Sequence, residues 1–67
     1  MDTLTFNGTT YTGTYVAGNN GSDGTFTVTA GTTVNTTANN LTMARLNNQD
    51  VYIQSGDNNG QFFVMPA

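Results

Sequence analysis

The side chains of this chain that could carry out chemistry are few and of few kinds. Its 67 residues include four Asp and one Arg, but no His, Cys, Lys or Glu. Acid–base catalysis needs a group that titrates near neutral pH or can be tuned to it, and a Ser or Thr nucleophile needs a neighbouring base. Asp among Gly and Asn is better explained by hydrogen bonds within turns. We therefore expect no catalytic residues and no enzymatic activity.

The sequence also offers few side chains that could bind a metal or a cofactor. Zinc and other transition metals take Cys and His ligands, which the sequence lacks. Calcium binds oxygen-rich loops, and only residues 20–23 and 57–59 are rich enough in Asp and Asn to be considered. Neither segment has the spacing of an EF-hand loop, and each holds one carboxylate. We expect no metal site and no cofactor.

The charge balance narrows the classes of partner. The formal net charge is −3, and Arg45 is the only base. Nucleic-acid binding and attachment to an anionic membrane both need several Lys or Arg, so we expect no nucleic acid and no membrane as a partner. The sequence starts without a basic and apolar leader and has no apolar run long enough to span a membrane. We therefore expect it to be made in the cytoplasm.

The elements that must position any functional side chain are predicted to be β-strands. Thr alternates with apolar residues, most clearly over residues 25–30. Asn7-Gly8 is a strong signal for a two-residue hairpin turn. Gly13 is expected to mark a bend or bulge, and Val16 interrupts the alternation, so a kink is expected there.

Further along the chain the pattern is less regular. Residues 32–37 predict a weak, polar strand, and residues 41–46 fit a strand better than a helical turn. Residues 47–50 predict a turn, and residues 61–65 a strand that is apolar on both faces, hence central or at an interface. The sum is an all-β, single domain over residues 1–67: a small barrel or sandwich of about six short antiparallel strands.

Two segments of the sequence are weakly similar to each other, and we call this similarity the internal echo. A Gly/Asn-rich loop at residues 18–21 precedes Phe-x-Val at 26–28, and a similar loop at residues 56–60 precedes Phe-x-Val at 62–64. Thr, Asn and Gly make up 32 of the 67 residues, and so biased a composition produces such echoes by chance. The echo alone does not establish a duplication.

Size and edge composition both point to a partner. A domain this small has marginal stability and usually adds a disulfide, a metal or a second subunit, and the chain has no Cys. Natural sheets protect their edge strands with Lys, inward charges or Pro, and this chain has no Lys and one Pro. We therefore expect at least one strand edge to pair within an assembly. The candidate partner interface comprises Arg45, Tyr52, Phe63 and Met65.

A short, nearly uncharged, Thr-rich chain of this kind resembles the small capsid decoration (cement) proteins of tailed bacteriophages. The likeness is carried by the Thr-alternating segments 25–30 and 32–37 and by the Asn-Gly turns at 7, 20 and 59. It implies a non-enzymatic structural virion protein on the outer capsid surface. Such a protein bridges and stabilises subunits of the major capsid protein, as a homo-oligomer (trimer or dimer) or ordered on the larger assembly.

Two other hypotheses stay open. One is a small glycan- or protein-binding β module of the adhesion type, whose aromatic platform would be formed by Tyr11, Tyr15, Tyr52 and Phe63. It requires the tyrosines to face solvent together. The other is a designed or excised β domain with no independent role. The absence of the surface Lys and Glu that designs usually carry argues against it.

Overall fold

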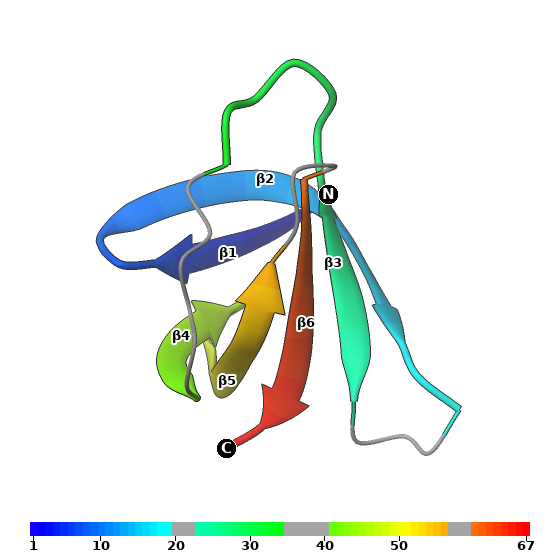
Figure 1. Ribbon diagram of the computed structural model, residues 1–67, viewed down its shortest axis with the longest axis vertical. Helices are drawn as coiled ribbons and strands as arrows, with labels where there is room; N and C mark the ends of the chain where they lie inside the picture. Colours follow the sequence, from blue (N-terminus) through cyan, green and yellow to red (C-terminus); the bar gives the residue numbers. More distant parts are fainter. Residues whose placement is uncertain (20–22, 35–40, 57–59) are drawn as a thin grey trace.

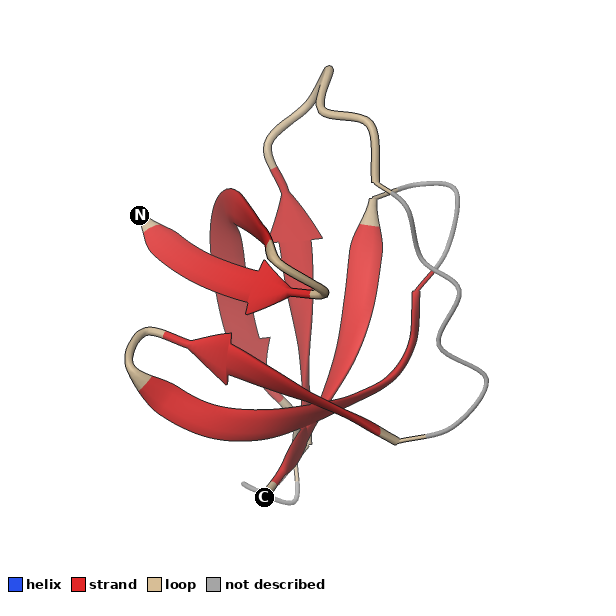
Figure 2. Ribbon diagram, turned by 90° about the vertical axis from the view of Figure 1, so that its left-hand side faces the viewer, coloured by secondary structure: helices blue, strands red, loops and turns tan. Residues whose placement is uncertain are grey.

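The computed structural model describes residues 1–19, 23–34, 41–56 and 60–67, and every regular element in these ranges is a strand (Figures 1 and 2). The strands are β1 (Asp2–Phe6), β2 (Thr9–Ala17), β3 (Gly24–Val28), β4 (Thr42–Leu46), β5 (Gln49–Gly56) and β6 (Gln61–Pro66). They form a closed barrel in the order β1-β2-β3-β6-β5-β4, with every neighbouring pair antiparallel. The all-β prediction is confirmed, and of the two predicted architectures the barrel is the one observed.

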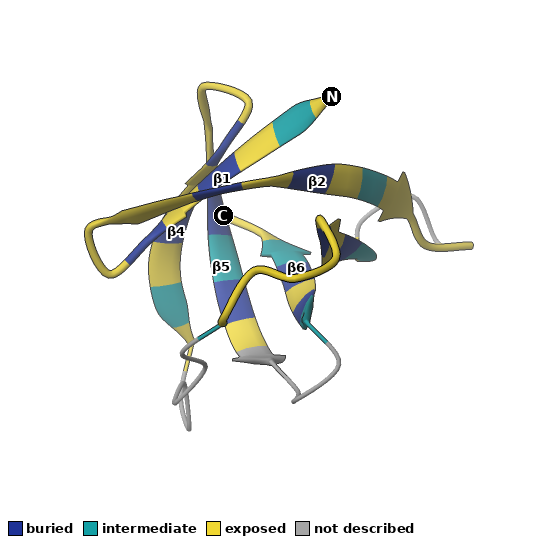
Figure 3. Ribbon diagram, turned by 90° about the horizontal axis from the view of Figure 1, so that it is seen from above, coloured by how far each residue is buried: buried dark blue, intermediate teal, exposed yellow. Residues whose placement is uncertain are grey.

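The inside of the barrel is filled by the apolar residue of each alternating pair, so buried and exposed bands alternate along the strands in Figure 3. The ring of Phe62 lies among three others, with centroid distances of 5.2 Å to Tyr11, 5.5 Å to Phe6 and 6.5 Å to Phe26. Such tilted and edge-on ring pairs are favourable. The buried core consists of Leu4, Phe6, Tyr11, Phe26, Val28, Ala44, Leu46, Val51, Ile53, Phe62 and Val64.

Two tight turns of the same kind join β1 to β2 and β4 to β5. The first has Asn7 and Gly8 at φ 51° and 81°, and the second has Asn47 and Asn48 at φ 48° and 66°. A two-residue turn with both φ values positive matches the twist of antiparallel strands, and Asn and Gly are the residues that adopt it at least cost. The hairpin predicted from Asn7-Gly8 is thus confirmed.

Gly13 is the point at which β2 passes from one neighbour to the next. It pairs with Asp2 of β1 and with Val28 of β3, and it is buried. A Cβ at this position would overlap the carbonyl group of Thr27, at 2.8 Å from the carbonyl carbon, so only Gly allows the close approach of the two backbones. The bulge offered as one prediction for Gly13 is absent, because both ladders run through it in regular register. Pairing also continues in register through Val16 to Ala17, and the bend at Gly13 and the kink at Val16 stay predictions.

The barrel consists of two similar halves, β1–β3 (the first half) and β4–β6 (the second half). In the first hairpin Thr3 pairs with Thr12, and in the second Met43 occupies the same place opposite Tyr52. The halves meet along β3 and β6, where the two Phe-x-Val motifs lie side by side and Phe26 pairs with Phe62. The echo seen in the sequence therefore coincides with equivalent positions in the two halves.

The second meeting line, between β1 and β4, is short. Its ladder has two pairs, Leu4 with Leu46 and Thr5 with Arg45. Asn47 extends it: its backbone N–H donates to the carbonyl of Thr3 at 3.0 Å, and its side-chain Oδ1 accepts from the Thr3 N–H at 2.9 Å. A side chain thus satisfies backbone groups that a longer ladder would pair.

Three expectations from the sequence need correction. Residues 32–34 form no strand, because Thr32 bonds back to the Thr29 carbonyl in a turn around Gly31 at φ 87°; residues 35–37 lie outside the described residues. The turn expected over residues 47–50 is confined to 47–48, and residues 49–50 already belong to β5. The expected unpaired strand edge is absent from the described strands, since barrel closure gives each of them two neighbours.

Candidate functional site

The residues predicted for a partner interface lie on one surface, the outside of the second half. Tyr52 of β5 pairs with Met43 of β4 on one side and with Met65 of β6 on the other. Arg45 and Phe63 point the same way as Met43 and Met65, because each lies two residues along the same strand. We call this surface the outer face of β4–β6; it comprises Met43, Arg45, Asp50, Tyr52, Phe63 and Met65.

The outer face of β4–β6 exposes large apolar side chains. Met43 retains 50% of its accessible surface and Phe63 44%, whereas Tyr52 and Met65 are partly buried. Leu41, immediately before β4, is also exposed. A contiguous exposed apolar patch on a small protein marks a contact surface more often than chance exposure of single residues does.

Met43 and Asp50 are the members of this face that the sequence does not single out, and Met43 is the larger omission because it is apolar and exposed. The segment 41–46 was ambiguous because residues 43, 44 and 46 also suit a helical turn, which would have buried Met43. The structure places Ala44 and Leu46 inside the barrel, and strict alternation then turns Met43 outward. The available signal was the i, i+2 spacing of Ala44 and Leu46, read with their likeness to Leu4 and Phe6 in the first hairpin.

Arg45 is held on this face by Asp50, its direct cross-strand neighbour. The Arg45 Nη1 donates to the Asp50 Oδ1, and the two side chains retain 54% and 56% of their accessible surface. An ion pair this exposed contributes little to stability because solvent screens it. Its effect is on the surface: it places one positive and one negative group side by side at the margin of the apolar patch.

The aromatic platform that a glycan-binding module would use does not form. Tyr11 is inside the barrel with 4% of its surface exposed and contacts the ring of Phe62. Tyr15 also points inward, and its ring lies against Gly24, where a Cβ would be 2.6 Å from the ring carbon Cζ. Tyr52 and Phe63 lie outside, so the four rings are divided between the two sides of the sheet.

The carboxylate of Asp2 is held in place by two hydrogen bonds. It accepts from the backbone N–H of Tyr15 at 2.7 Å and from the side-chain amide of Asn47 at 3.1 Å. The bond from Tyr15, and next the bond from Asn47, lower the pKa of Asp2 below its usual value because both favour the charged carboxylate. A carboxylate held ionised by two donors ties β1 to β2 and to the second turn, and is a poor proton donor or acceptor near neutral pH.

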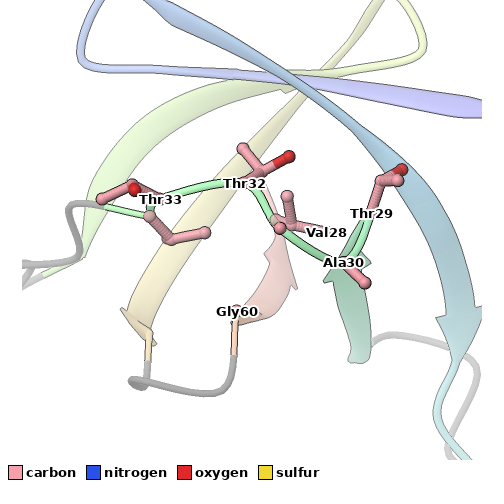
Figure 4. Close-up of a pocket in the computed structure, with 8 residues that line it drawn as sticks. Val28, Thr29, Ala30, Thr32, Thr33 and Gly60 are labelled. Carbon is pink, nitrogen blue, oxygen red and sulfur yellow. The ribbon is translucent and has the colours of Figure 1, made fainter.

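Two open hollows of about 440 Å³ lie at opposite ends of the barrel. The first lies where β3 ends and β6 begins, and Figure 4 shows the segment from Val28 to Thr33 arching along it with Gly60 opposite. It is lined by small apolar and Thr side chains without a charged group. The second lies beside Tyr15, Asp50 and Met65, so it adjoins the outer face of β4–β6.

Within the described ranges, His, Cys, Asp and Glu nowhere gather in a group of three that could hold a metal ion. The calcium loops considered from the sequence fall mainly on residues 20–22 and 57–59, which lie outside the described residues. None of the described residues belongs to a helix that could cross a membrane.

Comparison with known proteins adds no family to this description. No protein-family model, no curated protein and no solved structure matches the chain.

Proposed function

We propose that the protein is a non-enzymatic structural protein that works by burying an outer surface against other proteins. The observation that carries this proposal is the outer face of β4–β6. Met43 and Phe63 are about half exposed there, beside Tyr52 and Met65, on a closed barrel that supports them from behind. Met, Tyr, Phe and Arg are the residues enriched in protein–protein interfaces.

Within this class, a capsid decoration protein of a tailed bacteriophage is the role that best combines the features of the chain. The domain is small, nearly uncharged and Thr-rich, and its side chains offer little for catalysis. On this proposal it sits on the outer surface of the virion after synthesis in the host cytoplasm. It bridges neighbouring subunits of the major capsid protein.

Stabilisation of a shell by such a protein is additive over many copies. Each Å² of apolar surface removed from water contributes about 25 cal/mol. A footprint too small to hold a free pair of proteins firmly still strengthens a shell when it is repeated at every equivalent site, because shell subunits must separate together for the shell to open.

Co-sedimentation with empty capsids tests the proposal, using capsids assembled from the major capsid protein of the same genome. We expect saturable binding at a fixed ratio of this chain to capsid subunits, and a higher temperature of capsid disruption when the chain is bound. A folded chain that neither sediments with these capsids nor shifts their disruption temperature would refute the decoration role.

A further inference from the structure

Comparing the two halves of the barrel shows which residues the fold itself requires, because both halves have the same arrangement of strands. At matching positions the cores are both apolar, as with Leu4 and Ala44, and both hairpins turn through residues with positive φ. Their outer positions differ at six matching places, although Val16, on the outside of the first half, is also apolar and 63% exposed. The first half has a row of Thr3, Thr12 and Thr29 in which the Thr29 N–H donates to the Thr12 carbonyl.

The matching row of the second half is Met43, Tyr52 and Met65. The same correspondence holds for three more outer positions: Arg45 and Asp50 take the places of Thr5 and Thr10, and Phe63 takes the place of Thr27. All six residues of the outer face of β4–β6 therefore match an exposed Thr in the first half.

This correspondence shows that the fold does not require apolar residues on the outer face of β4–β6. Thr at the same strand positions, over a similar core, builds the first half of the same barrel. Thr is also a good strand former, so replacing it by Met gains little in strand propensity. The apolar side chains and the ion pair are explained by contact with something outside the barrel.

The charges on the face indicate what that contact is. Arg45 and Asp50 are neighbours of opposite sign, both more than half exposed. In a two-fold pair the same patch meets itself, so residue i of one copy faces residue j of the other and the reverse. A face with one base beside one acid is complementary to its own copy turned about such an axis.

A two-fold pair of this kind needs more surface than the six residues of the outer face alone. A specific protein interface buries about 800 Å² on each partner, out of the 4246 Å² that the chain exposes in total. Neighbouring exposed residues, Leu41 before β4 among them, must therefore join the contact. A two-fold contact over this face would also supply the second subunit that a domain without disulfides is short of.

We infer that the outer face of β4–β6 is covered by a second copy of this chain in a two-fold dimer, with Tyr52 near the axis and Arg45 of each copy facing Asp50 of the other. The inference rests on the proposed function. It assigns the contact surface of that proposal to binding between two copies of the chain. The first half and the loops of each barrel then remain outward, so the dimer has two equivalent ends with which to bridge two capsid subunits.

Sedimentation velocity over a range of concentrations tests the apolar part of this contact. We expect the full chain to be a dimer, and the variant Met43→Thr, Tyr52→Thr, Phe63→Thr, Met65→Thr to be a folded monomer by circular dichroism. Each substitution installs the Thr of the matching position. The matched control Thr3→Ser, Thr12→Ser, Thr27→Ser, on the outside of the first half, is expected to stay dimeric.

Charge reversal tests the two-fold geometry without disturbing the apolar patch. Arg45→Asp and Asp50→Arg are each expected to weaken the dimer on the order of tenfold or more, because like charges then face each other twice. An equimolar mixture of the two variants is expected to restore the dimer, since each site again joins opposite charges. These exposed positions leave the core intact, so the readout does not depend on the fourfold Thr variant folding.

Three outcomes would overturn the inference: a monomeric wild-type chain, a fourfold Thr variant that remains dimeric, or a mixture of charge variants that associates no better than either alone. A wild-type monomer that binds capsids, and a Thr variant that does not, would assign the face to the capsid protein instead. A stable dimer that ignores capsids would refute the decoration role and leave the dimer standing, so the two failures are distinguishable.

Discussion

Replacing Gly13 by Ala is the sharpest test of how this barrel closes. The backbone at Gly13 does not have a positive φ, so Ala is not excluded by conformation. It is excluded by space: the new Cβ would overlap the carbonyl oxygen of Thr27, and it would lie 2.8 Å from the Thr27 carbonyl carbon and 3.0 Å from Cε1 of Phe26. Two of these three atoms belong to the backbone, so rotamer changes cannot relieve the clash and β2 must move away from β3.

The size of the effect follows from this geometry. Overpacking a filled site costs about 1–3 kcal/mol and occasionally more, and a backbone clash belongs at the upper end of that range. Domains of this length have unfolding free energies of about 3–10 kcal/mol. Gly13→Ala is thus expected to remove about 3 kcal/mol, a large part of the total. With a urea m-value of about 1 kcal/mol per M, the midpoint falls by about 3 M.

Urea unfolding followed by far-ultraviolet circular dichroism measures this shift, because the chain has no Trp to report by fluorescence. Gly31→Ala is the matched control. Gly31 has φ 87° and nothing within 4 Å of an added Cβ, so its variant carries only the left-handed strain of about 1–2 kcal/mol. If Gly13→Ala proves no more destabilising than Gly31→Ala, the argument from close backbone approach is refuted.

Three further predictions concern the core, the acid range and the β1–β4 ladder. Phe62→Ala should lower the unfolding free energy by about 3–5 kcal/mol, because a fully buried ring is lost, whereas Val16→Ala, at a side chain that is 63% exposed and outside the outer face of β4–β6, should change it by under about 1 kcal/mol; comparable urea midpoints would contradict this. Asp2 has a lowered pKa when folded, so its contribution is complete above the unfolded pKa and is lost as the pH falls through the folded one. Asp2→Asn should therefore flatten the loss of stability below about pH 4, and unfolding midpoints that fall with pH as steeply as in the wild type would argue against it. Asn47→Ala should cost about 2 kcal/mol by losing the side-chain bonds to Thr3 and Asp2 and straining a positive φ, and Asn47→Gly about half as much by losing the bonds alone; equal losses in a thermal melt would show that φ does not matter.

Local signals in the sequence were enough to predict the strands. The hairpin turn at Asn7-Gly8 and the alternation that begins at residue 25 are each encoded within a few residues, and the structure contains both. The alternating strand predicted over residues 25–30 is two residues too long, because β3 ends at Val28 and Ala30 is exposed. Residues 61–65, apolar on both faces, were expected to be central or at an interface. Phe62 and Val64 fill the core, while Phe63 lies on the exposed outer face.

The closure of the barrel could not be predicted in the same way. It depends on β1 meeting β4 and on β3 meeting β6, two pairings between segments far apart in the sequence. No residue of β1 is specific for β4, since alternating apolar strands can pair with many others. For the same reason an open edge is predicted wrongly: the strands do lack Lys, but barrel closure gives each described strand two neighbours.

The sequence indicates four of the six residues of the outer face of β4–β6, namely Arg45, Tyr52, Phe63 and Met65, and only the cross-strand register shows that they share one surface. That this surface binds a partner stays a prediction. The aromatic platform failed because Tyr11 and Tyr15 alternate into the core. That inward position depends on which face of β2 the barrel closes over, and the Thr residues between them gave no indication of it.

The short β1–β4 ladder has a consequence for how the molecule behaves when it fluctuates. With two residue pairs and one Asn side chain, this line is the least extensively paired in the barrel, and local opening begins where few contacts must break. Each opening exposes the free backbone groups of β1 and β4, and no lysine stands nearby to discourage another molecule from pairing with them. Barrel closure therefore protects the strand edges of this chain, as charged edge residues protect those of an open sheet. Its resistance to aggregation depends on how rarely the β1–β4 ladder opens.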